Sequence, residues 1–225
     1  MMNRVFFRLV GWSMAASLLA ISVYVPSLGA QTIFAPMPKL EAGEIDGGLA
    51  ISPYRRKIHS SSGGSSASLD YSRDTVFANY GLPDKANLHF ELSNVDLGSL
   101  RGLELATGYY GRLGQPTTLG SRRMNKGYFG IARYANLAMK GINGTLLQID
   151  AGAGATVAFD KRFSAYGSVL LSWISGDIDG NGFGAEDPLG IVGGGFVKLD
   201  PAITLGGEIH LWYESGISIY GSMRF

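Results

Sequence analysis

The sequence predicts an all-β fold: a closed antiparallel transmembrane β-barrel of about ten strands, with eight as the alternative count. Three observations predict it. From Ile45 onward, apolar and polar residues alternate in segments near the 9 to 11 residues that a tilted membrane strand requires. Turn signals such as Asp200-Pro201 separate these segments. The last segment, residues 217–225, alternates up to a terminal phenylalanine.

That last segment indicates a cellular location. Its odd-numbered residues, Ile217 to Phe225, would share one face, because side chains of a strand point alternately to opposite faces. The segment resembles the C-terminal signature strand of Gram-negative outer-membrane β-barrels. In that family the final aromatic residue is read by the barrel assembly machinery. The resemblance implies a place in the bacterial outer membrane, with outer-membrane lipids and the assembly machinery as partners and Phe225 as the assembly signal.

The N-terminal region predicts export. Arg4 and Arg8 precede a mostly apolar stretch that ends in small residues at Ala30, as in a secretory signal peptide of residues 1–30. No later run of about 18 apolar residues follows, so we expect no membrane-spanning helix. Residues 31–44 contain two prolines and little periodicity, and we expect a periplasmic tail there. Residues 45–225 would form the barrel.

Two hairpins in the second half carry the clearest alternation. The turn Asp160-Lys161 joins the first pair of segments, residues 147–159 and 163–173. The turn Asp200-Pro201 joins the second pair, residues 189–199 and 203–213. Ten residues at about 3.3 Å each, tilted about 40°, rise roughly 25 Å, the height of the apolar band of such barrels. Aromatic residues would then form two girdles. We expect Tyr80, Phe159, Phe163 and Phe225 at the periplasmic rim, and Trp173 and Tyr213 at the outer rim.

The first half is less regular. Residues 76–92 form a hairpin pattern around Pro83-Asp84-Lys85 and resemble hairpins of porin-like and transporter-like outer-membrane proteins. Tyr71 lies out of phase with Val76, which predicts a bulge near Arg73 and Asp74.

A second irregularity lies between Lys126 and Leu137. If Phe129 and Ile131 face lipid, Arg133 does too, and a lipid-facing arginine costs about 2 to 4 kcal/mol at the membrane midplane. We therefore expect a bulge or a phase error in this segment.

Composition excludes several classes of function. Removing residues 1–30 takes away two arginines and no acids, so the formal net charge falls from +1 to −1. No nucleic-acid-binding footprint is visible. The chain has no cysteine, which excludes disulfides and thiolate sites. Its 33 glycines are scattered through the alternating pattern, as expected for coiled strands and turns.

Three polar segments, residues 56–68, 94–101 and 176–187, would form external loops. In the third, Asp177, Asp179 and Asn181 resemble the opening of an EF-hand calcium loop. The twelfth position is Pro188 rather than glutamate, so the bidentate ligand is missing. We favour an acidic solvated loop and predict no metal site, with weak external calcium binding as the alternative.

Charged residues fall on the inward faces of the predicted strands. They could act as catalytic acids and bases, or they could pair across the lumen. A barrel of eight to ten strands encloses little water, so we favour pairing. We predict no catalytic residue and no cofactor. The predicted lumen polar cluster comprises His89, Glu91, Glu104, Arg112, Asp150, Lys198, Glu208, His210 and Arg224.

One enzymatic alternative centres on His210, with Glu208 and Glu214 nearby. Small barrel enzymes such as lipid A deacylases and palmitoyltransferases use a histidine with serine or an acid near the outer rim. The residue two positions after His210 is Trp212 rather than the deacylase serine, and the sequence has no Gly-x-Ser-x-Gly motif. His59 and Ser61 have the required spacing but lie in a serine-rich run.

We therefore predict a small non-enzymatic barrel that provides envelope integrity, surface interaction or narrow-pore passage of small solutes. Two alternatives remain open. One is an outer-membrane lipid-modifying enzyme of acyl hydrolase or acyltransferase type. The other is a soluble lipocalin-like binder of an apolar ligand, which would place the apolar residues inside the barrel and the polar residues outside. An external ligand at the loops is not identified by the sequence.

Overall fold

The computed structural model describes residues 40–60, 66–212 and 214–225. The predicted signal peptide, most of the predicted tail and Tyr213 therefore lie outside the described residues. No helix among the described residues is long and apolar enough to span a membrane. The strands are β1 (Ile45–Ser60), β2 (Ser66–Leu82), β3 (Ala86–Leu97), β4 (Leu100–Arg112), β5 (Thr117–Leu119), β6 (Arg122–Met139), β7 (Ile142–Ala158), β8 (Phe163–Ile178), β9 (Asn181–Ala185), β10 (Leu189–Lys198), β11 (Ile203–Trp212) and β12 (Glu214–Arg224).

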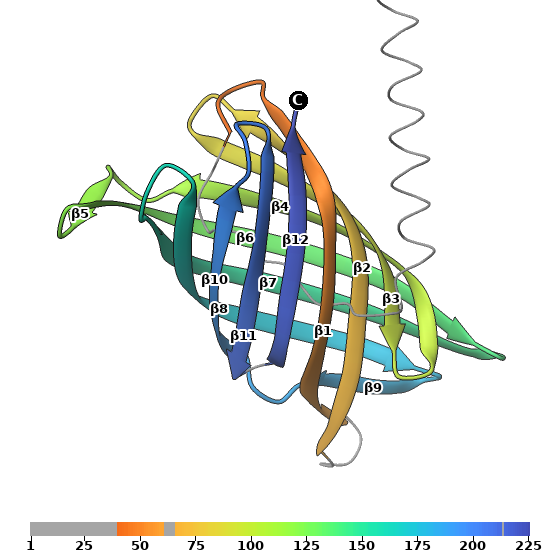
Figure 1. Ribbon diagram of the computed structural model, residues 1–225. Coiled ribbons are helices and arrows are strands. Elements are labelled where there is room, and N and C mark those ends of the chain that lie inside the picture. The colour runs from red at the N-terminus through yellow and green to blue at the C-terminus, as the bar shows by residue number, and fades with distance from the viewer. Residues whose placement is uncertain (1–39, 61–65, 213) are drawn as a thin grey trace, which may run out of the picture.

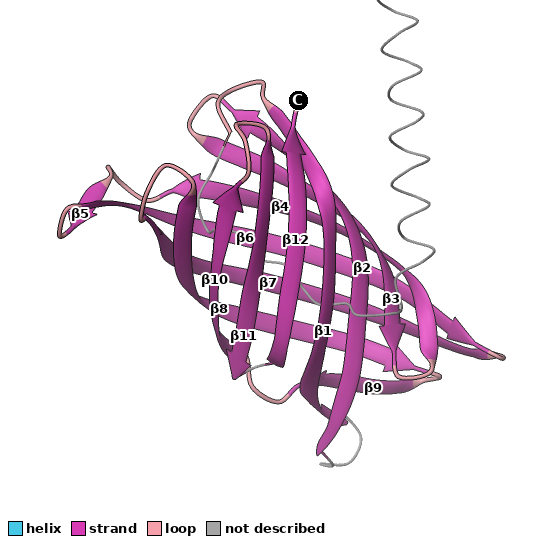
Figure 2. Cartoon of the chain, viewed as in Figure 1, coloured by secondary structure: helices cyan, strands magenta, loops and turns pink. Residues whose placement is uncertain are grey.

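Ten of these strands close a barrel (Figures 1 and 2). The order around the barrel is β1, β2, β3, β4, β6, β7, β8, β10, β11 and β12, and each strand is antiparallel to its neighbours. Closure is made by β12 and β1, where Tyr220 lies opposite Ala50. The prediction of a closed antiparallel barrel is confirmed, with ten strands rather than eight. The short strand β5 pairs only with β6.

Around the middle of the barrel, apolar side chains face outward, and the lumen holds polar side chains together with layers of apolar ones. Leu105 on β4, Val169 on β8 and Ile219 on β12 are all more than half exposed. The residues that alternate with them along each strand are buried inside, such as Ser168 before Val169 and Ser218 before Ile219. This arrangement suits a barrel surrounded by lipid. It excludes the lipocalin-like alternative, which requires the opposite arrangement.

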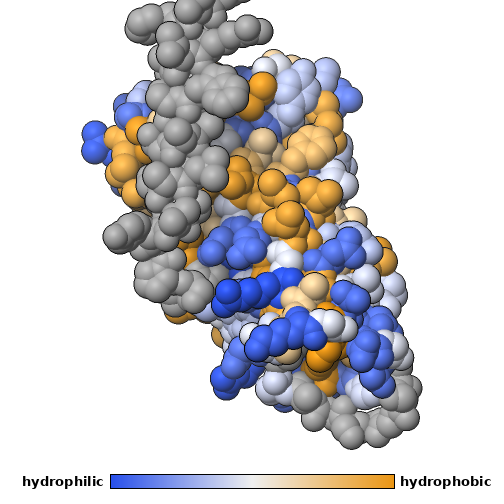
Figure 3. Space-filling model, turned by 90° about the vertical axis from the view of Figure 1, so that its right-hand side faces the viewer, coloured by the Kyte–Doolittle hydropathy of each residue, from blue (hydrophilic) through white to orange (hydrophobic). Residues whose placement is uncertain are grey.

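Seven strands continue beyond this apolar band, and there the polarity inverts. The 17 residues of β7 rise roughly 43 Å if tilted about 40°, compared with a band of about 25 Å. Above Leu147 the outward residues of β7 are Thr145 and Asn143. Figure 3 shows hydrophobic side chains on one part of the surface and hydrophilic side chains over the lower part. We call these outer ends of β1–β4 and β6–β8, together with β9, the head.

The interior of the head is apolar. A cluster of buried side chains fills it, with only Tyr54 and Tyr71 contributing hydroxyl groups. The head therefore has the polarity of a water-soluble β-barrel, apolar inside and polar outside. We call this cluster the apolar plug; its buried members are Tyr54, Tyr71, Val95, Leu97, Leu100, Ala135, Leu137, Leu146, Ile174 and Phe183.

Strand β9 closes the head. It pairs with β8 at residues 175–178 and with β1 at residues 58–60, while β10, β11 and β12 do not extend into the head. The pairing of β10 with β8 stops at Leu171, and that of β12 with β1 stops at Arg56. One strand thus replaces three, so the head has eight strands around it. Its Phe183 contributes to the apolar plug.

The predicted bulge near Arg73 and Asp74 is absent. β2 pairs with β1 without interruption from Tyr80 to Ser66, and Tyr71 and Arg73 both face inward. The prediction was wrong because it placed Tyr71 on the lipid-facing side. In the head, an inward aromatic residue belongs to the apolar core.

The phase predicted for β6 was also wrong. Phe129, Ile131 and Arg133 are all buried in the lumen, and β6 pairs with β4 and β7 without a bulge. Tyr128 and Tyr134 are exposed on the outer surface instead. The sequence predicts either a bulge or a phase error in this segment, and the structure shows that it is a phase error. The reason is an apolar lumen layer at this level, formed by Ala106, Tyr110, Phe129, Ile131, Leu170 and Val192.

The three predicted loops are mostly strand. Among the described residues, the only break in strand within residues 94–101 is the tight turn at 98–99, and residues 176–187 contain the end of β8, the β8–β9 turn and all of β9. Their polar character reflects the hydrated outer surface of the head. The predicted rim aromatics Tyr80, Phe159, Phe163 and Phe225 are exposed at or next to strand ends on the side away from the head, and Trp173 is exposed on β8 towards the head.

The change of medium along one strand gives a testable difference. Val169 and Ser175 both point outward from β8, the first in the apolar band and the second in the head. We expect Val169→Lys to lower the free energy of unfolding by about 2 to 4 kcal/mol, because a lysine then faces hydrocarbon. Ser175→Lys should change it by less than about 0.5 kcal/mol. Urea titration of the barrel in lipid vesicles measures both values, and equal losses would contradict the assigned membrane level.

Candidate functional site

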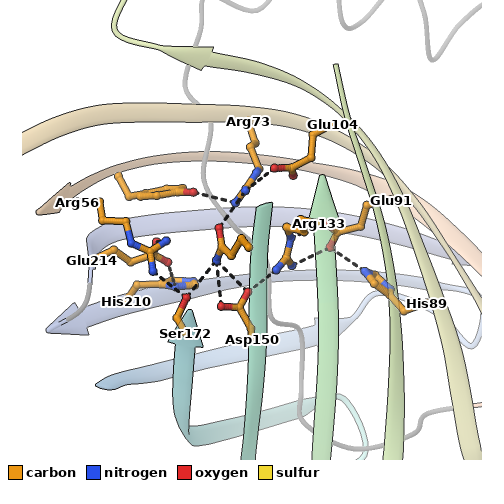
Figure 4. A network of polar contacts seen from close by, with 12 residues as sticks. Arg56, Arg73, His89, Glu91, Glu104, Arg133, Asp150, Ser172, His210 and Glu214 are labelled. Atoms are coloured by element: carbon orange, nitrogen blue, oxygen red, sulfur yellow. Dashed lines mark hydrogen bonds and ion pairs between the residues drawn. The ribbon is translucent and has the colours of Figure 1, made fainter. Parts of the chain in front are cut away.

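A buried polar network crosses the lumen next to the apolar plug, on the side away from the tip of the head (Figure 4). Its first centre is Arg73 on β2, which is 1% exposed. Its guanidinium donates to Glu104 at 2.6 Å and to the hydroxyl of Tyr54 at 2.7 Å. The guanidinium carbon also lies 4.5 Å from the ring centroid of Tyr71, whose hydroxyl donates to Glu104 at 3.0 Å. Arg73 is thus held by one carboxylate and two tyrosines.

The second centre is Arg133 on β6. Its guanidinium donates to Glu91 on β3, with Nε 3.1 Å from Oε2, and pairs with Asp150 on β7. Glu91 Oε1 lies 2.7 Å from Nε2 of His89, and Nδ1 of that ring lies 2.7 Å from Oδ1 of Asn79. Four strands therefore meet at one arginine, and both acidic partners are buried.

Gln148 connects the two centres. Its side-chain oxygen accepts from Arg73 at 3.2 Å, and its amide nitrogen donates to Asp150, the partner of Arg133, at 2.9 Å. The same nitrogen lies 3.4 Å from Ser172 Oγ. A single amide can serve both centres because it carries an acceptor and two donors.

A third group lies at the level where β11 ends and β12 begins. His210 lies between two carboxylates, with Nδ1 2.8 Å from Glu214 and Nε2 3.3 Å from Glu208. Arg56 lies 3.7 Å from Glu214 and donates to Ser172 Oγ at 2.7 Å. Ser172 therefore joins this group to Gln148.

The network is arranged to offset the cost of burying charge. An unpaired ion in a low-dielectric interior is strongly unfavourable, whereas a paired and hydrogen-bonded one is tolerated. Three arginines and two histidines face five carboxylates, and all ten side chains are buried. These carboxylates are Glu91, Glu104, Asp150, Glu208 and Glu214.

The structure divides the nine residues of the predicted lumen cluster into two sets. Six belong to the central network: His89, Glu91, Glu104, Asp150, Glu208 and His210. The other three, Arg112, Lys198 and Arg224, line a cavity at the opposite end of the barrel from the head. That cavity is described below.

Sequence reasoning missed the three arginines that organise the network. Arg56 lay in a segment taken for a loop, Arg73 next to an expected bulge, and Arg133 on a strand read in the wrong phase. One signal was present: an arginine is far less costly in the lumen than in lipid, so Arg133 itself indicated which face of β6 points inward.

His210 is enclosed by acidic side chains. Both ring nitrogens lie close to carboxylates, the side chain is fully buried, and the hydroxyl of Ser172 is engaged by Arg56 rather than by the imidazole. A general base must reach the proton it removes.

In the described part of the chain, no group of three or more His, Cys, Asp or Glu side chains is arranged so that it could hold a metal ion. At the β8–β9 turn, Asp177 Oδ1 accepts the backbone N–H of Gly180 at 2.8 Å, so this carboxylate closes the turn.

The lumen is closed on the head side of the network. The cavity between Arg56 and the plug residues Tyr54, Leu97 and Phe183 is about 20 Å³, enough for about one water molecule. Among the described residues, the apolar plug fills the lumen on this side.

A closed ladder, an apolar outer band and a charge-paired lumen define the class: a small outer-membrane β-barrel. No family model matches the sequence, and no curated protein matches it. Among solved structures, the chain is similar to an outer membrane channel from Pseudomonas putida F1, with 10% identity over 87% of this chain and 100% of that chain and a TM-score of 0.43.

Two further solved structures are also similar. Neisserial surface protein A has 10% identity over 80% of this chain and 97% of that chain, with a TM-score of 0.41. The attachment invasion locus protein Ail of Yersinia pestis has 12% identity over 83% of this chain and 100% of that chain, with a TM-score of 0.22.

Removing Arg133 tests the energetic role of the network. Arg133→Leu leaves Glu91 and Asp150 without their cation, and we expect it to lower the free energy of unfolding by about 3 to 5 kcal/mol. The control is Arg55→Leu, which removes an exposed ion pair with Asp70 at 2.8 Å and should cost less than about 1 kcal/mol. Unfolding in vesicles measures both, and a small loss for Arg133→Leu would show that the network does not stabilise the barrel.

Proposed function

We propose that this chain is a non-enzymatic outer-membrane barrel that is closed to solutes and presents its head to the cell exterior for surface interaction. The inversion of polarity along the strands carries this proposal. The head has an apolar core of its own and a polar outer surface, which is the arrangement of a domain that stands in water above the membrane.

The dimensions support exposure of the head. Residues 142–146 of β7, which lie in the head, rise roughly 13 Å beyond the apolar band if tilted about 40°. The outward surface of this part carries ion pairs between Arg55 and Asp70 and between Arg101 and Asp96. A hydrated, charged surface at this height suits contact with soluble or surface-bound partners better than contact with lipid.

Two features support a role without turnover or transport. His210 and its acidic neighbours are buried and mutually engaged, so a lipid-modifying reaction has neither a free base nor access for its substrate. The apolar plug opposes passage of ions, because moving a charge into an apolar layer is costly. Export would use the predicted signal peptide, and insertion would use the assembly machinery that reads Phe225.

Conductance measurement tests closure. We expect the folded chain to insert into planar lipid bilayers without stepwise conductance, since the plug blocks the lumen. A general porin under the same buffer is the positive control, and a heat-dependent mobility shift in gel electrophoresis shows that the inserted protein is folded. Reproducible steps in most insertions would instead favour narrow-pore passage of small solutes.

Site-directed labelling tests the orientation of the head. The chain has no cysteine, so a single introduced one reports its own position. We expect Asn143→Cys, on the outer surface of the head, to react with a membrane-impermeant maleimide in intact cells. The matched control Lys161→Cys, in the turn between β7 and β8 at the other end, should react only after the outer membrane is permeabilised. The reverse pattern would overturn the proposed orientation.

A further inference from the structure

A second cavity lies inside the barrel at the end opposite the head. It has a volume of about 390 Å³ and is bounded by the strand ends farthest from the head, with Phe196 and Thr156 among its lining residues. We call it the vestibule. Small-molecule sites of proteins start at about this size. The vestibule is separate from the central network, and the proposed surface function does not use it.

The lining of the vestibule is rich in positive charge. Six cationic side chains and three carboxylates surround the cavity. Two of the carboxylates are already engaged. Asp46 accepts from the Asn79 amide at 2.6 Å, and Asp160 accepts the backbone N–H groups of residues 162 and 163. The cations are Lys85, Arg112, Arg123, Lys161, Lys198 and Arg224.

Strand alternation directs several of these cations inward. Arg112 on β4, Arg123 on β6 and Lys198 on β10 each lie in phase with lumen residues of their strand: Tyr110, Phe129 and Phe196. None of the three has a carboxylate partner among the described residues. Arg224, by contrast, lies 3.4 Å from Glu44. Three inward cations without an ion-pair partner thus face one cavity, and its three carboxylates leave the lining with an excess of positive charge.

Two hydrogen-bond donors strengthen this assignment. The hydroxyl of Thr156 belongs to a side chain only 5% exposed, lines the vestibule, and has no hydrogen-bond partner among the described residues. Nε of Arg112 is likewise buried without a partner there, and its guanidinium makes only a long contact of 3.4 Å with Asn125. Buried donors in proteins are normally satisfied, so an acceptor is expected in this space.

We propose that the vestibule binds a small multivalent oxyanion from the periplasmic side, held by Arg112, Arg123 and Lys198 and by the Thr156 hydroxyl. Phosphate and carboxylate oxygens are the acceptors that guanidinium groups bind most strongly. More than one negative charge is needed to balance three cations. The closed lumen above makes the vestibule a binding pocket rather than the entrance to a channel.

Calorimetric titration tests the proposal with the full mature chain folded in an uncharged detergent. The probes are sodium pyrophosphate and sodium citrate, titrated separately at low ionic strength. We expect one binding site per chain, with an affinity that falls as sodium chloride is raised. Tighter binding of pyrophosphate would assign the site to phosphate compounds, and tighter binding of citrate would assign it to polycarboxylates. Absence of binding for both probes would overturn the proposal.

Variants identify the residues. The double variant Arg112→Gln and Lys198→Gln should weaken binding at least tenfold. The control Lys57→Gln also removes one positive charge, but from the outer surface of the head, and it should leave binding unchanged. Thr156→Val keeps the side-chain shape and removes the hydroxyl, and we expect about threefold weaker binding. The heat-dependent mobility shift shows whether each variant is folded. Undiminished binding in both the folded double variant and Thr156→Val would overturn the assignment to the vestibule.

Discussion

The medium outside each strand determines the rest of this structure. Every strand has two faces, and the bilayer requires that one of them be apolar over a height of about 25 Å. Above that height water replaces lipid, and the same outward positions become polar, as at Thr145 on β7 and Ser175 on β8. The inward face responds in the opposite sense. Behind the lipid band it carries the paired charges together with layers of apolar side chains, and within the head it is apolar.

The central network fixes how the strands align. A slip of one residue moves every side chain of a strand to the other face. For β6 such a slip would place Arg133 in lipid and remove the cation shared by Glu91 and Asp150. Similar consequences follow for Arg73 on β2. Buried ion pairs contribute little net stability when compared with apolar packing, but a misaligned pair is costly. The paired charges therefore select one register for the barrel.

The alternating pattern was sufficient to predict the barrel where the lumen is lined by small or polar residues. Residues 147–173 are an example, because Ser168 and Ser172 contrast with the outward Val169 and Leu171. It failed on β6, where lumen and lipid faces are both apolar and hydrophobicity cannot tell them apart. It failed again in the head, because a method that assumes lipid outside misreads a segment that stands in water. The partners of each charge depend on strands distant in sequence, so the network itself was beyond single-sequence reasoning.

The replacement of three strands by β9 has a geometric consequence. The diameter of a barrel grows roughly linearly with its strand number, and eight strands leave an interior that side chains alone can fill. Ten strands enclose more space than that. The chain therefore tapers: its wider part holds the vestibule of about 390 Å³, and its narrower part is solid. The barrel is therefore open at its wide end and closed at its narrow end. The narrowing arises because β10, β11 and β12 stop before the head and the five-residue strand β9 takes their place.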